Sequence, residues 1–338
     1  MVHGKEDKMN RKLTKKLEEA GFKSITQMTR EEYKPFEDDI ECSDLTLTNL
    51  LAYDANYHYM VKRISDCLVI TGINVNHQLA CTLIPLNKEE AGEVLTEVNG
   101  LFHSMDLPLT LDLMCEKYKV LFENHPLVEE ISYNPDYSDY VYSIAEYIDL
   151  EGGKNSKKRR HMNHVEKNVP GCRFEVIDNF EEKKPVIMDI MNSWCENHEC
   201  SECVYGCEKK IIEHLLDTNT SKQLYGGLLY IEDEPEMFAI GEIIQDTYYL
   251  YFKKSKNSID GTFFYFEYYL LKEISDVTYV NFEEDMGLAG LRTYKSRRHP
   301  IRMIDKYVIK LKENAKALLV SEDEKSMQCE FYAERKVI

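Results

Sequence analysis

The stretch that best indicates the fold of this chain is Asn281-Phe-Glu-Glu-Asp-Met-Gly-Leu-Ala-Gly-Leu-Arg-Thr-Tyr-Lys295, which places three acids, two glycines and two bases together. Its pattern predicts the end of a strand, an acidic turn and a helix that begins at Leu288. This turn sets Asp285 beside the unpaired N–H groups of the first helical turn, with Arg292 and Lys295 on the turns that follow. An ordinary helix N-cap is the alternative interpretation of Asp285.

The second half of the chain, followed outward from this junction, alternates strand and helix patterns. Three β-rich runs predict a meander at 223–232, 236–244 and 247–254, with turns at Glu232-Asp-Glu-Pro235 and Gln245-Asp246. A helix near 262–274, a strand at 278–282, a helix at 288–296 and a strand at 301–310 complete this half. The first half has the same order, with strands at 57–63, 67–73 and 78–84, a helix at 89–103, a strand at 109–114, a helix at 116–123 and a strand at 128–133.

This repeated β-β-β-α-β-α-β order is that of the acyl-CoA N-acyltransferase (GNAT) fold. It predicts an α/β (α+β) protein of two tandem GNAT-like lobes, each a mixed, largely antiparallel sheet flanked by helices. The joint between the lobes falls near residues 142–153, where Gly152-Gly153 interrupts the helical character. We therefore expect a charged N-terminal segment at 1–30, lobes at 31–150 and 151–312, and a charged tail at 313–338.

The composition restricts the partners and the compartment of the protein. The 60 acidic and 42 basic residues give a net charge of −18, so any site for a polyanion must be a local basic patch. No export leader opens the chain and no apolar run has the length of a membrane span, so we expect no transmembrane segment. Ten cysteines without a secretory signal favour reduced thiols. A soluble, cytoplasmic protein is predicted.

Four blocks of sequence resemble bacterial proteins of unknown function that are grouped with the C-terminal domain of phosphatidylglycerol lysyltransferase. The blocks are Ser43-Asp-Leu-Thr-Leu-Thr-Asn-Leu50, Asp139-Tyr-Val-Tyr142, Lys157-Lys-Arg-Arg-His-Met-Asn163 and Glu284-Asp-Met-Gly-Leu-Ala-Gly-Leu-Arg-Thr-Tyr-Lys295, within a region of about 31–310. The resemblance implies a tandem GNAT fold. It also implies transfer of an aminoacyl group from a charged tRNA to an acceptor.

The resemblance carries over to individual positions of this sequence. The matching residues are Lys158, Arg159, His161, Asn163, Glu242, Lys254, Asp285, Arg292 and Lys295. The chain departs from the residues usual in the family at Arg160, Lys253, Phe282 and Arg297-Arg298. These departures concern the donor or acceptor pocket and leave the predicted fold unchanged.

Two lysine-rich segments are the candidate substrate-binding sites. Lys154, Lys157, Lys158, Arg159, Arg160 and His161 form the densest basic run, which on a helix offers phosphate contacts on two faces. We predict a contact to tRNA phosphate or a phospholipid headgroup there, with a solvated helix face as the alternative. Lys253 and Lys254 begin a loop with a single glycine, whereas an acyl-CoA enzyme carries several glycines there to hold the pyrophosphate. An exposed lysine loop is the alternative.

Aminoacyl transfer needs a base for the acceptor proton and a donor for the developing oxyanion. Glu242 or Asp285 is the predicted base, and Lys295 or Arg292 the electrostatic stabiliser. Cys195, Cys200, Cys203 and Cys207 are weak candidates for a metal site, with free thiols as the favoured interpretation. Tyr248-Tyr-Leu-Tyr251 and Phe263-Phe-Tyr-Phe266 are expected to pack between sheet and helix.

The leading functional prediction is therefore an aminoacyltransferase with aminoacyl-tRNA as donor and an amine or hydroxyl acceptor, in a phospholipid headgroup or a peptide. Two alternatives stay open. The first is an acyl-CoA-dependent N-acyltransferase, and the second is a non-catalytic binding protein on a GNAT scaffold. Binding of acetyl-CoA separates the first two, and turnover with any donor separates both from the third.

Overall fold

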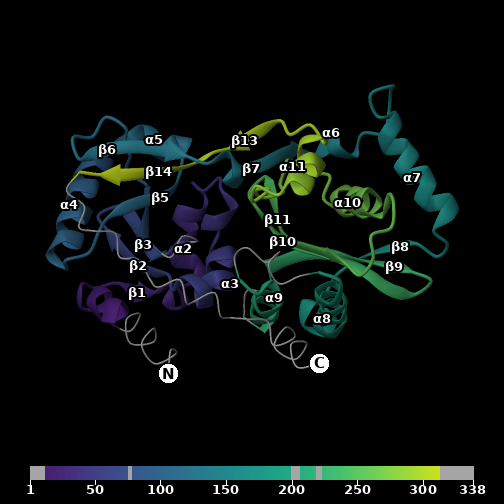
Figure 1. Ribbon diagram of the computed structural model, residues 1–338, viewed down its shortest axis with the longest axis horizontal. Coiled ribbons are helices and arrows are strands. Elements are labelled where there is room, and N and C mark those ends of the chain that lie inside the picture. The colour runs from purple at the N-terminus through teal and green to yellow at the C-terminus, as the bar shows by residue number, and fades with distance from the viewer. Residues whose placement is uncertain (1–11, 75–77, 199–205, 218–222, 313–338) are drawn as a thin grey trace. The chain divides into compact units, whose positions relative to one another are not determined.

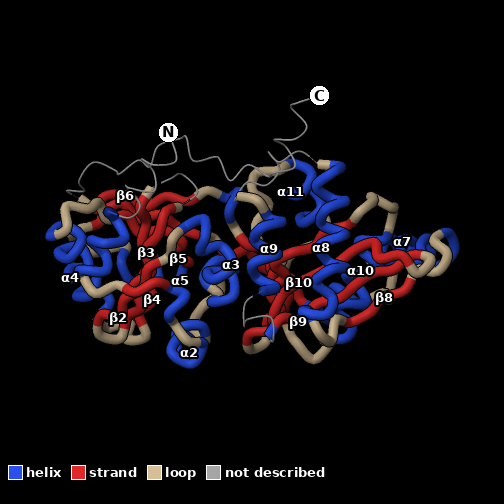
Figure 2. Tube along the Cα trace, turned by 90° about the horizontal axis from the view of Figure 1, so that it is seen from below, coloured by secondary structure: helices blue, strands red, loops and turns tan. Residues whose placement is uncertain are grey.

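The computed structural model describes residues 12–74, 78–198, 206–217 and 223–312, and the chain divides into two compact units. The first unit comprises residues 1–138 and 304–338, and the second comprises 139–303. Each unit contains one seven-stranded sheet with helices packed against it (Figures 1 and 2). These two mixed sheets flanked by helices confirm the predicted pair of GNAT-like lobes.

The sheet of the first unit has the order β1-β2-β3-β4-β5-β14-β6. β4 and β5 run parallel, and the other pairs are antiparallel. β3 and β4 are buried along their whole length, as their continuous apolar sequences predict. The strands are β1 (Lys23–Ser24), β2 (Met60–Ile64), β3 (Cys67–Ile73), β4 (Leu79–Pro85), β5 (Thr110–Cys115), β6 (Val128–Tyr133) and β14 (Lys306–Leu311).

The helices of the first unit begin where local sequence favours a start. Thr29 and Glu32 form a reciprocal capping box at α2, and Thr46 caps α3 through the N–H of Asn49. Residues 12–19 are helical as well. The other elements are α2 (Arg30–Glu37), α3 (Leu47–Tyr57), α4 (Ala91–Ser104), α5 (Glu116–Phe122) and the short 3-10 turns Ile25–Gln27, Ser43–Leu45 and Pro135–Tyr137.

The sheet of the second unit has the order β13-β7-β12-β11-β10-β9-β8, with β11 and β12 parallel. The predicted hairpin turns are present: Glu232 and Asp233 both have positive φ between β9 and β10, and Gln245 does so between β10 and β11. The strands are β7 (Asp139–Ser143), β8 (Arg173–Val176), β9 (Leu224–Ile231), β10 (Glu234–Ile244), β11 (Thr247–Ser255), β12 (Tyr279–Asn281) and β13 (Arg302–Ile304).

Helices cover both faces of this second sheet (Figure 1). α10 packs with α6, α7 and strands β8 and β9, whereas α8 packs with α9, β10 and β11. The core on the α10 face includes Tyr248, Phe264, Tyr265 and Phe266, so the two aromatic runs pack in the core as expected. The helices are α6 (Ile144–Ile148), α7 (Ser156–Asn168), α8 (Phe180–Asn197), α9 (Glu208–Asp217), α10 (Thr262–Glu273) and α11 (Ala289–Ser296).

The sheets exchange strands between the two halves of the sequence, which the sequence-based boundaries did not include. β7 precedes the expected joint at 142–153 but pairs with β12 in the second sheet. The strand expected at 301–310 is two strands: β13 stays in the second sheet, and β14 lies between β5 and β6 in the first, where its yellow arrow stands among blue strands in Figure 1.

No helix within the described ranges has the length and apolar character needed to cross a bilayer. The tail predicted at 313–338 and residues 1–11 of the predicted N-terminal segment lie outside the described residues.

Candidate functional site

The parallel strands β11 and β12 part soon after they meet. They pair only over Thr247–Tyr249 and Tyr279–Asn281, and β11 then continues to Ser255 whereas β12 ends. Ligand sites of open α/β sheets are found at the carboxyl ends of parallel strands, where neighbouring strands diverge. The place where a ligand site is expected is therefore beyond Tyr249 and Asn281, on the face covered by α10 and α11.

A buried ionic cluster occupies this place. Glu267 of α10 is completely buried and accepts hydrogen bonds from Lys253 of β11 and from the hydroxyls of Tyr147 and Tyr294. Arg298, just after α11, also pairs with it, with 3.2 Å between Nη2 and Oε2. Arg298 Nε additionally donates to the Tyr147 hydroxyl at 2.6 Å. Four side chains from three separate segments thus converge on one carboxylate.

The electrostatics of this cluster hold it charged. Burial alone would raise the pKa of Glu267, but Lys253 and Arg298 outweigh it and lower that pKa to about 2. Burial lowers the pKa of Lys253, an effect that Glu267 opposes. The pKa values of Tyr147 and Tyr294 are raised by burial and by the adjacent carboxylate. The cluster thus sets two basic side chains, Lys253 and Arg298, against one carboxylate.

The predicted junction after β12 forms a second, neighbouring arrangement. Asp285 is buried and binds Arg292 through two hydrogen bonds of 2.8 and 2.7 Å. Its carboxylate also accepts from the Tyr140 hydroxyl at 2.6 Å and from the Gly287 N–H at 2.9 Å. Burial would raise the pKa of Asp285, but these donors outweigh it and lower the pKa. The N-cap interpretation is wrong, because Leu288 occupies the N-cap position of α11.

Lys295 fixes the backbone of this junction from within. Its buried ammonium donates to the carbonyl oxygens of Phe282 at 2.5 Å, of Glu283 at 3.2 Å and of Glu284. Two non-glycine residues here, Glu283 and Met286, have positive φ angles of 56° and 54°, a conformation that needs external support. The ammonium of Lys295 supplies that support at Glu283, and the Asp285 carboxylate, which accepts from the Gly287 N–H, spans Met286.

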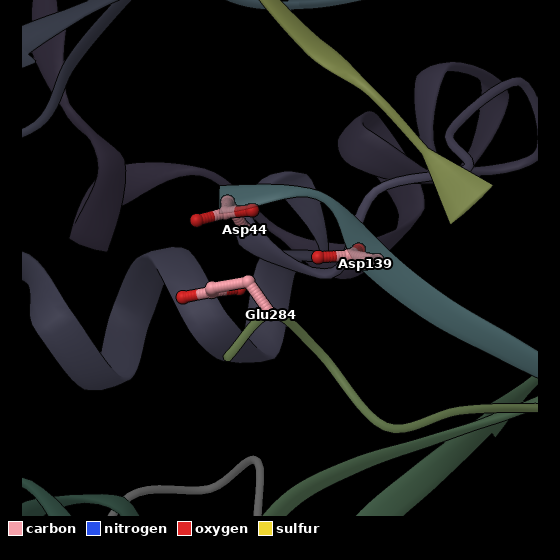
Figure 3. Close-up of side chains that lie close together, drawn as sticks. All are labelled: Asp44, Asp139 and Glu284. Atoms are coloured by element: carbon pink, nitrogen blue, oxygen red, sulfur yellow. The ribbon is translucent and has the colours of Figure 1, made fainter. Parts of the chain in front are cut away.

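Two further buried carboxylates lie near Lys295. Carboxylate oxygens of Asp139, at the start of β7, and Glu284 approach within 4.8 Å of each other, and Figure 3 shows both side chains. Burial lowers the pKa of Lys295 to about 8, although these acids act in the opposite direction. Asp44, also labelled in Figure 3, belongs to the first unit.

Glu242 and Lys254 lie on the other face of the second sheet. Lys253 pairs with Ala239 of the α10-side core, and Glu242 is three residues further along β10, so its side chain points to the opposite face. Glu242 is buried and accepts a 2.6 Å hydrogen bond from the Tyr251 hydroxyl. Lys254 pairs with Glu208 of α9 at 2.5 Å. Lys253 and Lys254, which were predicted to act together in one loop, therefore point to opposite faces of the sheet.

The basic run of α7 divides into backbone contacts and exposed charges. Lys158 donates to the Glu146 carbonyl at 2.7 Å, and Arg159 donates to those of Leu150 and Gly152. His161 is partly buried, with Nδ1 3.9 Å from a carboxylate oxygen of Asp260. The exposed members of the run and its neighbours are Lys154, Lys157, Arg160 and Asn163. Lys158 links this helix to the ionic cluster, because its Nζ lies 6.0 Å from the Tyr147 ring centre.

The loop from β11 to α10 is filled by a protein carboxylate. Glu236, which is buried, accepts from the Asn257 N–H at 2.6 Å, from the Asn257 side chain at 3.0 Å and from the Ser255 hydroxyl at 3.1 Å. Gly261, the glycine of this loop, has φ +83° and faces α7, where an added Cβ would lie 3.1 Å from Val165. Its conformational freedom serves the packing of α7 against α10.

The predicted metal site can be placed only in part. Cys195 is half-buried on α8, and Cys207 is buried just before α9. Cys200 and Cys203 lie outside the described residues, so the metal prediction stays a prediction.

The centre of the buried cluster, Glu267, was not predicted from the sequence. Glu267 follows the run Thr262–Phe266 and precedes Tyr268-Tyr-Leu-Leu271, so a single acid within an apolar helix was its signal. Arg298 was noted only as a departure, and Tyr147 and Tyr294 were not singled out. Of the predicted residues, the fold brings Asp285, Arg292 and Lys295 together and places Lys253 in the adjacent cluster.

Comparisons with known proteins agree with this architecture. The family described as "Phosphatidylglycerol lysyltransferase, C-terminal" matches residues 40–310. None of the curated proteins matches the chain. A conserved protein of unknown function from Bacteroides thetaiotaomicron is 23% identical, with a TM-score of 0.77, and the match covers 86% of this chain and 99% of that one.

Two other solved structures are more distant in sequence. The C-terminal domain of a putative lysylphosphatidylglycerol synthetase from Agrobacterium fabrum is 11% identical, with a TM-score of 0.58, over 82% of this chain and 90% of that one. L-PGS from Bacillus licheniformis is 13% identical, with a TM-score of 0.58, over 84% of this chain and 92% of that one. At these identities the likeness establishes the fold.

Proposed function

We infer the function from the family to which this chain belongs, the phosphatidylglycerol lysyltransferase C-terminal family, whose match extends over residues 40–310. We propose that the protein is an aminoacyltransferase that moves an aminoacyl group from a charged tRNA to an amine or hydroxyl acceptor. The acceptor is a phospholipid headgroup or a peptide. The family match carries this proposal, and cytoplasmic action on tRNA is part of it.

The β11–α10 loop favours aminoacyl-tRNA over acyl-CoA as the donor. In an acyl-CoA enzyme, main-chain N–H groups of this loop bind the pyrophosphate. Here the Asn257 N–H and the Ser255 hydroxyl already donate to the carboxylate of Glu236. A pyrophosphate would have to displace a buried anion and would be repelled by it. We therefore expect no binding of acetyl-CoA, which is the first alternative donor.

The exposed bases at the start of α7 are the proposed contact with tRNA. Lys154, Lys157 and Arg160 are exposed on a chain of net charge −18, so a polyanion is drawn to them and repelled elsewhere. Lys158 and Arg159 donate to backbone carbonyls, and we propose that they hold the helix in place rather than bind phosphate. A phospholipid headgroup is the alternative anion at this patch.

The reaction itself is a simple acyl exchange. The acceptor nitrogen or oxygen attacks the ester carbonyl of the aminoacyl-tRNA, the ester C–O bond breaks, and the acceptor proton passes to the departing tRNA hydroxyl. We propose that Arg292, half-exposed and oriented by Asp285, stabilises the developing oxyanion. Asp285 is an unsuitable base because four donors stabilise its charge, and we propose that Asp285 and Lys295 are positioning residues.

Glu242 is the proposed general base. Its partner across the strand pair is Tyr249, the last residue of β11 that pairs with β12. Glu242 therefore lies beside the point where β11 and β12 diverge, on the face of the sheet opposite to Arg292. We propose that the acceptor approaches from this face and the donor from the other, so that the two substrates meet between the diverging strands.

The first experiment compares binding of aminoacylated and uncharged bulk tRNA to the purified protein at low and moderate salt. We expect tighter binding of the charged form and a steep loss of affinity with salt. The variant Lys157→Glu/Arg160→Glu should weaken binding, whereas Lys15→Glu/Arg63→Glu, an equal charge change in the first unit, should not. Equal binding of charged and uncharged tRNA, or none at either salt, would contradict the proposal.

Turnover separates the proposed enzyme from a binding protein. Transfer of a labelled aminoacyl group to phospholipid vesicles or to a peptide mixture is the expected result. Tight binding of charged tRNA without transfer to any acceptor would support the non-catalytic alternative.

A further inference from the structure

Three aromatic rings surround the ammonium of Lys253. The distance from Nζ to the ring centre is 5.0 Å for Tyr294, 5.4 Å for Phe282 and 5.5 Å for Phe263. Phe263 and Phe282 lie within the range of a cation–π interaction, whereas Tyr294 accepts a hydrogen bond of 3.0 Å from Nζ through its hydroxyl. The carboxylate of Glu267 completes the surroundings. Aromatic faces with one carboxylate are the composition with which proteins bind alkylammonium groups.

We call Phe263, Phe282, Tyr294 and Glu267 the aromatic cage. The Glu267 carboxylate of this cage does not need Lys253 to neutralise its charge. Arg298 pairs with the same carboxylate, and its guanidinium carbon lies 3.4 Å from the Tyr294 ring centre. Glu267 therefore keeps one cation if Lys253 is removed. With both cations present the cluster has an excess of one positive charge, so a further cation entering it would be repelled.

We propose that Phe263, Phe282, Tyr294 and Glu267 form an alkylammonium site that the chain fills with its own Lys253. Lys253 is thereby a specificity-determining residue: the occupied site excludes an aminoacyl group with a cationic side chain and admits neutral or acidic ones. The second statement rests on the proposed aminoacyl transfer, whereas the first rests on the cage alone.

The location of the cage connects it to the transferred group. Phe282 follows β12 directly, and Lys295, three residues before Arg298, donates to the Phe282 carbonyl. The cage and the junction that bears Arg292 therefore share a segment of backbone and the helix α11. A side chain of the aminoacyl group that extends past Arg292 along β11 would meet Lys253.

The first test measures the cage without any tRNA. The thermal unfolding of Lys253→Ala should shift upward by several degrees in roughly 100 mM propylammonium chloride relative to equal sodium chloride, because the ligand binds only the folded state. In propylammonium chloride, wild-type protein and Lys253→Met should show no such shift. In 1-propanol, neither wild-type protein nor either variant should show it. The absence of a propylammonium-specific shift in Lys253→Ala would overturn the proposed site.

If Lys253→Ala does not fold on its own, the same ligand tests the site in a refolding experiment. In that case the yield of folded protein after refolding should rise with propylammonium and not with 1-propanol. Equal yields in the two would overturn the proposal.

The second test measures selectivity with non-hydrolysable aminoacyl-adenosine amides carrying lysyl or norleucyl groups, which differ by the ammonium. Wild-type protein should bind the norleucyl compound at least about tenfold more tightly, and Lys253→Ala should lose or invert this preference. Equal affinities of wild-type protein for the lysyl and norleucyl compounds would refute the specificity role of Lys253 without contradicting the proposed transferase activity. Binding of neither compound would remove the proposed transferase, while the propylammonium test still decides the cage.

Discussion

Replacement of Lys295 by methionine should uncouple the β12–α11 junction from the rest of the second unit. Methionine keeps the apolar stem, so the change removes mainly the ammonium that three carbonyl oxygens share. Removal of one partner from a buried ionic arrangement costs roughly 3–5 kcal/mol. It also leaves the positive φ angle of Glu283 without its support.

The single tryptophan of the chain gives a direct assay. Trp194 lies on α8 in the second unit, and the ammonium of Lys254 stands 4.1 Å from its ring centre, so its fluorescence reports the unfolding of this unit. Urea unfolding of Lys295→Met should show a free energy of unfolding about 3–5 kcal/mol below wild type, and a melting temperature lower by roughly 6–20 °C.

The matched control is Lys272→Met, an exposed lysine of α10, which should change the free energy of unfolding by less than about 1 kcal/mol. Amide hydrogen exchange of residues 282–287 should accelerate in Lys295→Met and not in the control. If Lys295→Met unfolds within about 1 kcal/mol of wild type, the three carbonyl contacts do not hold the junction and the reasoning is refuted.

Three further predictions address the cluster, the candidate catalytic arginine and the packing of α7. The low pKa of Glu267 contributes stability that is present above about pH 4.5 and is lost as pH falls toward about 2. The free energy of unfolding of Glu267→Gln, followed by Trp194 fluorescence, should therefore lack about 3 kcal/mol of the wild-type pH dependence between these pH values. Arg292→Lys should lower the aminoacyl transfer rate about tenfold or more, with melting little changed, because lysine cannot make the paired contact with a carboxylate. Gly261→Ala should cost roughly 1–3 kcal/mol in urea unfolding, whereas Gly290→Ala, with open space at its Cβ, should be neutral or stabilising.

The order of elements could be predicted from the sequence, whereas the membership of strands in sheets could not. Hydrophobic periodicity and turn residues locate β9, β10 and β11 to within two or three residues. The same local signals are present in β7 and β14, and nothing within these short strands indicates which sheet they join. That choice is made by long-range pairing, for instance of Ile309 with Leu111 and Ile131.

The candidate site was predictable where its residues are close in sequence. Asp285, Arg292 and Lys295 stand within one junction, so their density was visible. Strand alternation could also have separated Lys253 from Lys254, because successive side chains point to opposite faces. Glu267 was hidden by distance: its partners come from segments up to 120 residues away along the chain.

The exchange of β7 and β14 determines when the protein can fold during synthesis. The first unit lacks the strand between β5 and β6 until residue 311 has left the ribosome, although 138 of its residues emerge first. Until then the edges of β5 and β6 are open, and open edges template pairing between nascent chains. A stop codon between residues 304 and 311 would therefore leave the second unit, which is complete by residue 303, intact and deprive the first unit of β14.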